Sequence, residues 1–154
     1  MRAIWALTAV VLAYVVAPCV SAQPIALRDP RAYAETLADT MGVSGMAPLR
    51  SLYVEVSPNG AVSAAVEAAL LAYERGLPTT RAVIAKVEED VTLSDTYRQI
   101  YLYHYWGQNY WLHTRVDFVR ISDTEWAVSY VGFASDWAVL APPVTPGFRS
   151  ANRN

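Results

Sequence analysis

The two histidines, His104 and His113, are the residues whose chemistry is easiest to define from the sequence. An imidazole serves as a general base or as a metal ligand near neutral pH. A metal site would need a third ligand, and none lies at a convincing spacing from the two histidines. Asp117 follows His113 by four residues, so in a strand the two side chains would share a face, and a general-base pair is the functional interpretation of this spacing. We interpret these residues as polar side chains of a surface or an interface, and we predict no catalytic residue and no metal site.

Tyrosines gather in the same part of the chain, where side chains of alternate residues share one face of a strand. Tyr97, Tyr101, Tyr103 and Tyr105 fall on one face of a first long strand, and Tyr110 opens the next strand. We predict that this face packs on helices, with the hydroxyls at the edge of the core. The second interpretation is an aromatic pocket for a small apolar or planar ligand. The candidate pocket residues are Tyr73, Tyr101, Tyr103, Tyr105 and Tyr110.

The turn between the two tyrosine-rich strands decides which side chains meet. Gly107-Gln108 is a candidate two-residue turn with glycine at its first central position. That turn predicts the cross-strand pairs Tyr105–Tyr110, Tyr103–Leu112, Tyr101–Thr114 and Arg98–Asp117, the last being a favourable charge pair. A turn at Gln108-Asn109 would place His104 opposite His113 instead. The sequence leaves both registers open.

Several other classes of site and partner find no support in the sequence. The acidic run Glu88-Glu89-Asp90 lacks the spacing of a calcium loop, and we interpret it as a solvated bend between strands. No glycine-rich phosphate loop and no serine-nucleophile motif is present in the sequence. The net charge is −2, and no basic stripe marks a nucleic-acid partner. We therefore predict no cofactor and no nucleic-acid binding.

Residues 1–22 have the pattern of a secretory signal peptide. Arg2 precedes an uncharged apolar run, Pro18 interrupts any helix, and Val20-Ser21-Ala22 presents small residues to a signal peptidase. The apolar run is short for a membrane span, which needs about 20 residues. We predict export to the periplasm or the exterior with cleavage before Gln23, and no membrane span after cleavage.

Cys19 is the only cysteine, and it lies inside the predicted signal peptide. The residues Val16-Ala17-Pro18-Cys19 partly resemble a bacterial lipobox, so a lipoprotein anchored through Cys19 is the minor alternative. Pro18 stands where that box has a smaller residue. The chain that starts at Gln23 has no thiol and no disulfide, so its stability must come from its core.

Three helical segments are predicted in the first half of the exported chain. Asp29-Pro30 is an N-cap followed by a proline, apolar residues recur at helical spacing from Tyr33 to Met41, and Gly42 is the predicted end. Residues 48–56 fit both helical and strand spacing, and we favour a helix. The third helix carries a stripe predicted to face the core, formed by Val62, Val66, Leu70, Tyr73 and Leu77.

The second half of the chain changes to strand-like alternation. A strand begins within residues 82–87, and long strand-like runs cover residues 97–106, 110–121 and 126–133. Two tight turns between the three long runs predict an antiparallel meander. With 154 residues, 54% of them apolar, the chain suits a single domain. We predict one α+β domain over residues 23–141 and a disordered, proline-bearing tail over residues 142–154.

The aromatic runs resemble a known group of proteins. The resemblance is carried by Ser94-Asp95-Thr96-Tyr97-Arg98, by Tyr103-His104-Tyr105-Trp106-Gly107 leading into Tyr110-Trp111-Leu112-His113-Thr114, and by Glu125-Trp126-Ala127-Val128 leading into Asp136. The layout of residues 29–141 is similar to small exported bacterial proteins of the nuclear transport factor two-like, or cystatin-like, superfamily. The resemblance implies a curved sheet that wraps the helices into a cone with a cavity. Ketosteroid isomerase-like enzymes belong to this superfamily, but none of their catalytic residues matches here.

The face of the predicted sheet that points away from the helices is a candidate contact surface. It carries Leu102, His104, Trp106, Trp111, His113, Arg115 and Val119. An aromatic centre with polar neighbours is typical of protein interfaces, and the resemblance implies that sheets of this superfamily pair through such a face. We predict a homodimer with Trp106, Trp111 and His113 as interface candidates and Trp111 near the middle.

The function that these features favour is the binding of a small apolar ligand or a protein partner by an exported, non-enzymatic domain. The alternatives are a cavity enzyme of ketosteroid isomerase-like type and a self-associating structural module. A cavity lined by tyrosine and aliphatic side chains would favour binding. An Asp, Glu or His with a perturbed pKa inside that cavity would favour catalysis.

Overall fold

The structure is a computed structural model that describes residues 25–140. The helices α1 (Pro30–Ser44), α2 (Ala47–Val56) and α3 (Ala64–Gly76) precede the strands β1 (Ile84–Ser94), β2 (Tyr97–Gly107), β3 (Tyr110–Arg120) and β4 (Trp126–Ala134), and the short helix α4 (Trp137–Leu140) follows. The predicted α+β class is confirmed. The predicted signal peptide with Cys19, and the predicted tail over residues 142–154, lie outside the described residues.

Helix α1 begins as the sequence predicts and ends later. The Asp29 carboxylate caps it by accepting two backbone N–H groups of the first turn, at 2.9 and 3.2 Å. The predicted end at Gly42 is wrong, because the helix continues to a C-cap at Gly45, whose φ of 66° lies in the left-handed region. Gly42 instead allows a close approach, since a Cβ there would lie 2.7 Å from the Cβ of Ala85 in β1.

Ion pairs of Arg50 join helices α2 and α3. Residues 48–56 lie in α2, so the helical interpretation of this segment is confirmed. Arg50 of α2 donates from Nε to Glu67 at 3.2 Å, and its two terminal nitrogens donate to Glu74 at 3.0 Å. Leu70 is the only fully buried residue of α3, so this helix packs less deeply than its apolar stripe predicts.

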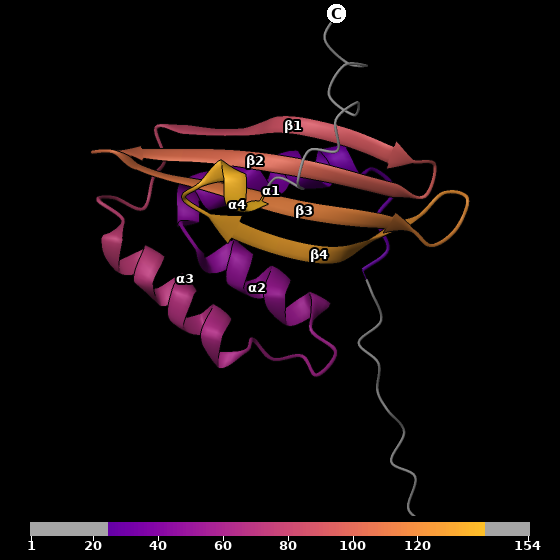
Figure 1. The fold of residues 1–154 in the computed structure, drawn as a ribbon, viewed down its shortest axis with the longest axis horizontal. Coiled ribbons are helices and arrows are strands. Elements are labelled where there is room, and N and C mark those ends of the chain that lie inside the picture. Colours follow the sequence, from indigo (N-terminus) through magenta and orange to yellow (C-terminus); the bar gives the residue numbers. More distant parts are fainter. Residues whose placement is uncertain (1–24, 141–154) are drawn as a thin grey trace, which may run out of the picture.

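The four strands form one antiparallel meander in the order β1-β2-β3-β4, as predicted. Figure 1 shows α1 behind the strands and α4 in front of them, so both faces of the sheet carry a helix. The predicted bend at Glu88-Glu89-Asp90 is wrong. This acidic run lies within β1, where the pairing with β2 passes from Val87 to Glu89 and leaves a bulge at Glu88.

The β2–β3 hairpin turns one residue later than the favoured prediction. The central residues are Gln108 and Asn109, with positive φ values of 52° and 61°. Two-residue hairpin turns of type I′ require positive φ at both central residues. The strand pairing then passes from Gly107 to Tyr105 and skips Trp106. This bulge shifts the register by one residue, so neither of the two predicted registers occurs.

The observed register reverses the predicted faces of β2. His104 pairs with Leu112, and His113 pairs with Tyr103, so the two histidines are not opposite each other. The pairs that replace the other predicted ones are Tyr105–Trp111, Tyr101–Arg115, Arg98–Phe118 and Gln99–Asp117. The even-numbered residues of β2 face the side of the sheet that α1 covers. The tyrosines at its odd-numbered positions face the opposite side, where α4 lies.

The core lies between the helices and the face of the sheet that α1 covers. Its buried residues include Ala34, Leu37 and Met41 of α1, Leu49 and Leu52 of α2, Ile100, Leu102 and Trp106 of β2, and Leu112, Val116 and Phe118 of β3. We call the opposite face, which α4 partly covers, the outer face. Among residues 25–140, no helix combines the length and the apolar character needed to cross a bilayer.

Candidate functional site

The candidate pocket tyrosines lie on two sides of the sheet and do not line a common cavity. Tyr73 and Tyr110 meet on the helix side, with ring centroids 6.1 Å apart, and the Tyr110 hydroxyl donates to the Tyr73 carbonyl at 2.7 Å. Tyr101, Tyr103 and Tyr105 lie on the outer face. The predicted tyrosine surface is therefore divided by the sheet, because the bulge at the hairpin changes the parity between β2 and β3.

The three interface candidates also separate. Trp106 is buried in the core, and its indole N–H donates to the Thr80 carbonyl at 3.3 Å, so its predicted place on an uncovered face is wrong. Trp111 lies on the outer face and is 40% exposed. His113 lies beside it on the same face, partly covered by Trp137 of α4 at a centroid distance of 5.3 Å.

A charged cluster occupies the outer face next to α4. Asp117 is 1% exposed and accepts the Tyr97 hydroxyl at 2.6 Å and the Arg115 Nε at 2.7 Å. Arg115 also donates from a terminal nitrogen to the carbonyl of Leu140 at 3.2 Å, which ties α4 to β3. The carboxylate is paired and hydrogen-bonded, as a buried charge must be, so we interpret this cluster as structural. Asp117 thus pairs with Arg115 and not with His113, and its predicted position at the surface is wrong because the carboxylate is buried.

His104 is fully buried beneath α1. Its Nε2 lies 3.0 Å from the carbonyl oxygen of Ala38, so this nitrogen carries the proton and Nδ1 presents a lone pair. Burial lowers the pKa of His104 below its usual value, so the ring is neutral near pH 7. Within residues 25–140, no three His, Cys, Asp or Glu side chains come together in a way that would hold a metal ion.

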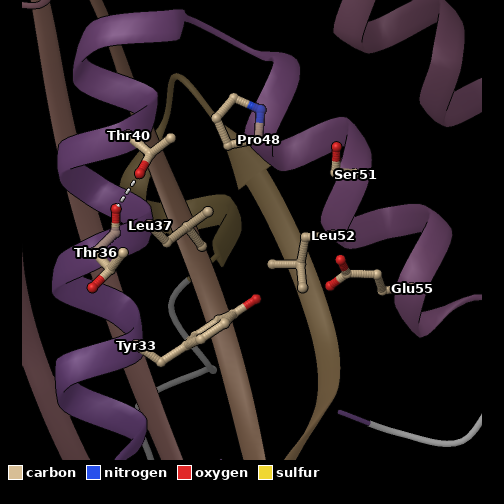
Figure 2. Close-up of a pocket in the computed structure, with 8 residues that line it drawn as sticks. All are labelled: Tyr33, Thr36, Leu37, Thr40, Pro48, Ser51, Leu52 and Glu55. Atoms are coloured by element: carbon tan, nitrogen blue, oxygen red, sulfur yellow. Dashed lines mark hydrogen bonds between the residues drawn. The ribbon is translucent and has the colours of Figure 1, made fainter.

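An open groove between α1 and α2 forms a concave surface that could receive a ligand (Figure 2). Its volume is about 210 Å³. The ring of Tyr33 and the side chains of Leu37, Pro48 and Leu52 form its apolar floor. Leu37 and Leu52 also belong to the hydrophobic core, so the floor is held by the packing of the whole domain.

The polar rim of the groove offers acceptors rather than donors. Thr36, Thr40 and Ser51 line it, and each hydroxyl donates to a carbonyl one turn earlier in its own helix, at 2.9, 2.7 and 3.3 Å respectively. A hydroxyl whose proton is committed in this way keeps only its lone pairs for a ligand. Figure 2 shows the Thr40 hydroxyl directed at the Thr36 carbonyl along the axis of α1.

Tyr33 and Glu55 supply the remaining polar groups of the groove. The Tyr33 hydroxyl points away from α1 toward the α2 side, where the Glu55 carboxylate lies (Figure 2). Burial, and to a smaller extent the negative charge of Glu55, raises the pKa of Tyr33 to about 12, so the phenol is neutral at physiological pH. None of the described residues that line the groove is basic, so Glu55 gives it a negative character.

The sequence predicted the two helices that form this groove, but not the groove itself. The helical spacing of Tyr33 and Leu37 indicated the packed face of α1, and the apolar spacing of residues 48–56 indicated a second helix. The groove depends on how closely the two helices approach each other, which neither pattern specifies. Neither pattern therefore identifies Tyr33 or Glu55 as a site residue.

No protein-family model, no curated protein and no solved structure matches this chain.

Proposed function

We propose that this chain is an exported, non-enzymatic binding domain whose α1–α2 groove takes a small apolar group of a ligand or a protein partner. The observation that supports this proposal is the composition of the groove, which has a volume of about 210 Å³, an apolar floor, and the Tyr33 hydroxyl and the Glu55 carboxylate as polar groups. Small-ligand sites are lined mainly by apolar side chains with a few polar groups that orient the ligand. The groove has this composition.

Binding is favoured over acid–base catalysis by the polar groups of the groove. A general acid and a general base must both lie within hydrogen-bond reach of a substrate. The groove offers one carboxylate, that of Glu55, and a phenol, Tyr33, whose pKa is raised to about 12. A phenol with so high a pKa is a poor proton donor and stays protonated near neutral pH, so it cannot serve as the base.

Titration with a small alcohol tests the groove directly. We expect cyclopentanol to shift the amide NMR signals of Thr36, Thr40 and Leu52 more than those of β1. Ser51→Phe should fill the groove and abolish these shifts, because Ser51 lines it. Ala72→Phe, at an exposed position of α3, is the matched control and should leave the shifts unchanged. Shifts spread evenly over the domain, or unaffected by Ser51→Phe, would refute binding in the groove.

We also propose that the domain has the cone-like packing of the nuclear transport factor two-like superfamily and is exported to the periplasm or the exterior. The order of helices before an antiparallel meander supports the first point, and the pattern of residues 1–22 supports the second. The intact mass of the exported protein should correspond to a chain that starts at Gln23. A mass that includes Met1, or a lipid on Cys19, would contradict the predicted cleavage.

Self-association through the outer face is a second candidate function, favoured by one observation. Ile84, Tyr105 and Trp111 are consecutive cross-strand partners on β1, β2 and β3, so their side chains form a row on this face. Ile84 and Trp111 are among the exposed large apolar residues of the domain. Aromatic and aliphatic side chains gathered at a surface are typical of the centre of a protein interface.

A further inference from the structure

We infer that the α1–α2 groove selects a cation, and that it binds the side chain of a lysine on a protein partner. The methylene stem would lie on the apolar floor, and the ammonium group would meet the Glu55 carboxylate and the oxygen of the Tyr33 hydroxyl. This inference rests on the proposed function and specifies the chemical group that the groove receives.

The hydrogen-bonding groups of the groove favour a cation. The hydroxyl protons of Thr36, Thr40 and Ser51 are committed to helix carbonyls, so these groups offer lone pairs to a ligand. Glu55 adds a carboxylate, which accepts hydrogen bonds only. An ammonium group is the complementary partner, because it carries three donors and no acceptor. A carboxylate or phosphate ligand would meet these lone pairs and the like charge of Glu55, with the Tyr33 hydroxyl as the only side-chain donor among the described lining residues.

The size of the groove favours a single side chain as its occupant. Its volume of about 210 Å³ is below the roughly 300–1,000 Å³ of ordinary small-molecule pockets. A single extended side chain fits this space better than a whole drug-sized ligand. Lysine places an apolar stem against apolar surface while its charged end stays near water. Here the stem would lie between Leu37 and Leu52, and Glu55 is exposed to solvent.

Exposed apolar residues of α1 and α2 favour a protein partner as the source of the ammonium group. A free alkylamine would leave the groove rims uncovered, whereas a protein partner would also contact the surface beside them. Val43 of α1 is 60% exposed and follows Thr36 and Thr40 at helical spacing. Val54 of α2 is 38% exposed and lies one turn from Ser51. These valines would contact the residues that flank the lysine, so we assign the ligand to a protein partner.

Three probes test the inference on the exported chain by NMR titration. They are the capped peptide Ac-Ala-Ala-Lys-Ala-Ala-NH2, the same peptide with norleucine in place of lysine, and n-butylammonium. Norleucine keeps an unbranched apolar stem and lacks the ammonium group. We expect the lysine peptide to shift the signals of Thr36, Thr40 and Leu52, and to bind more tightly than either other probe.

Glu55→Gln is the variant that removes the charge with little change in shape. We expect it to weaken binding of the lysine peptide by about two- to fivefold, the range for a solvent-exposed ion pair, and to leave the norleucine peptide unaffected. Glu89→Gln, at an exposed position of β1, is the matched control and should change neither affinity. Added salt should weaken the lysine peptide and not the norleucine peptide.

The outcomes separate this inference from the proposed function. If the norleucine peptide binds in the groove as tightly as the lysine peptide, the groove is an apolar site and the cation inference is wrong. If n-butylammonium binds as tightly as the lysine peptide, the assignment to a protein partner is wrong. If neither peptide nor cyclopentanol shifts the groove signals, the proposed function fails as well.

Discussion

Tyr105 and Trp111 are direct cross-strand partners, and both side chains lie on the outer face of the sheet. Trp106, the next residue after Tyr105, is skipped by the strand pairing and turns its ring into the core, where it is 2% exposed. A shift of one residue moves every side chain of a strand to the opposite face. The bulge at Trp106 therefore determines which aromatic rings of the hairpin stabilise the core and which remain available for contacts.

Replacing Trp106 should destabilise the domain far more than replacing Trp111. Removal of a fully buried tryptophan side chain costs about 3–5 kcal/mol, because it leaves a cavity, and Trp111 is 40% exposed. Urea unfolding at low protein concentration should show a large loss for Trp106→Ala and a much smaller loss for Trp111→Ala. Equal losses for the two variants would contradict the observed register.

The homodimer prediction now depends on Trp111, since Trp106 is in the core. Trp111→Asp should convert a dimer to a monomer without unfolding it, because a buried unpaired carboxylate is costly only in the dimer. Light scattering at micromolar concentration and circular dichroism measure the two effects. Leu71→Asp, at an exposed apolar position of α3, is the control and should leave the dimer intact. A monomeric wild type would refute the prediction, and so would a Trp111→Asp protein that fails to fold.

Arg115 should be essential for stability because it neutralises Asp117. The Asp117 side chain is almost fully buried, so Arg115→Met would leave an unpaired buried charge at a cost of about 3–5 kcal/mol. Tyr97→Phe removes one hydrogen bond to the same carboxylate and should cost about 1.5 kcal/mol. Denaturant unfolding at pH 7 measures both losses. Arg81→Met, at an exposed position, is the control, and a loss for Arg115→Met no larger than for this control would contradict the prediction.

Stability should decrease as the pH falls below about 6.5, because of His104. Burial lowers the pKa of His104 in the folded state below its usual value of 6.5, so the unfolded chain binds this proton more readily. The contribution is full above pH 6.5 and is lost progressively as the pH falls toward the folded pKa. The free energy of unfolding between pH 7.5 and 5.5 should therefore change more in the wild type than in His104→Leu. His113→Gln is the control that should keep the dependence, and parallel pH curves for wild type and His104→Leu would refute the prediction.

Local signals in the sequence predicted α1, α2 and α3 and the order of the strands, but not the short helix α4. Asp29 caps α1 as its side-chain chemistry indicates, and residues 48–56 form α2. Trp126, which opens β4 after a polar turn, is buried in the core. These features depend on neighbours within a few residues, which is the range over which sequence periodicity and capping act.

The tertiary structure alone decided which face of each strand is buried. Alternation along β2 groups Tyr101 with Tyr103 and Leu102 with His104, but it does not specify which group meets the helices. That choice followed from the bulge at Trp106 and from the packing of α1 on the sheet. The groove between α1 and α2 has the same origin, because the distance between two helices depends on long-range packing that no local spacing records.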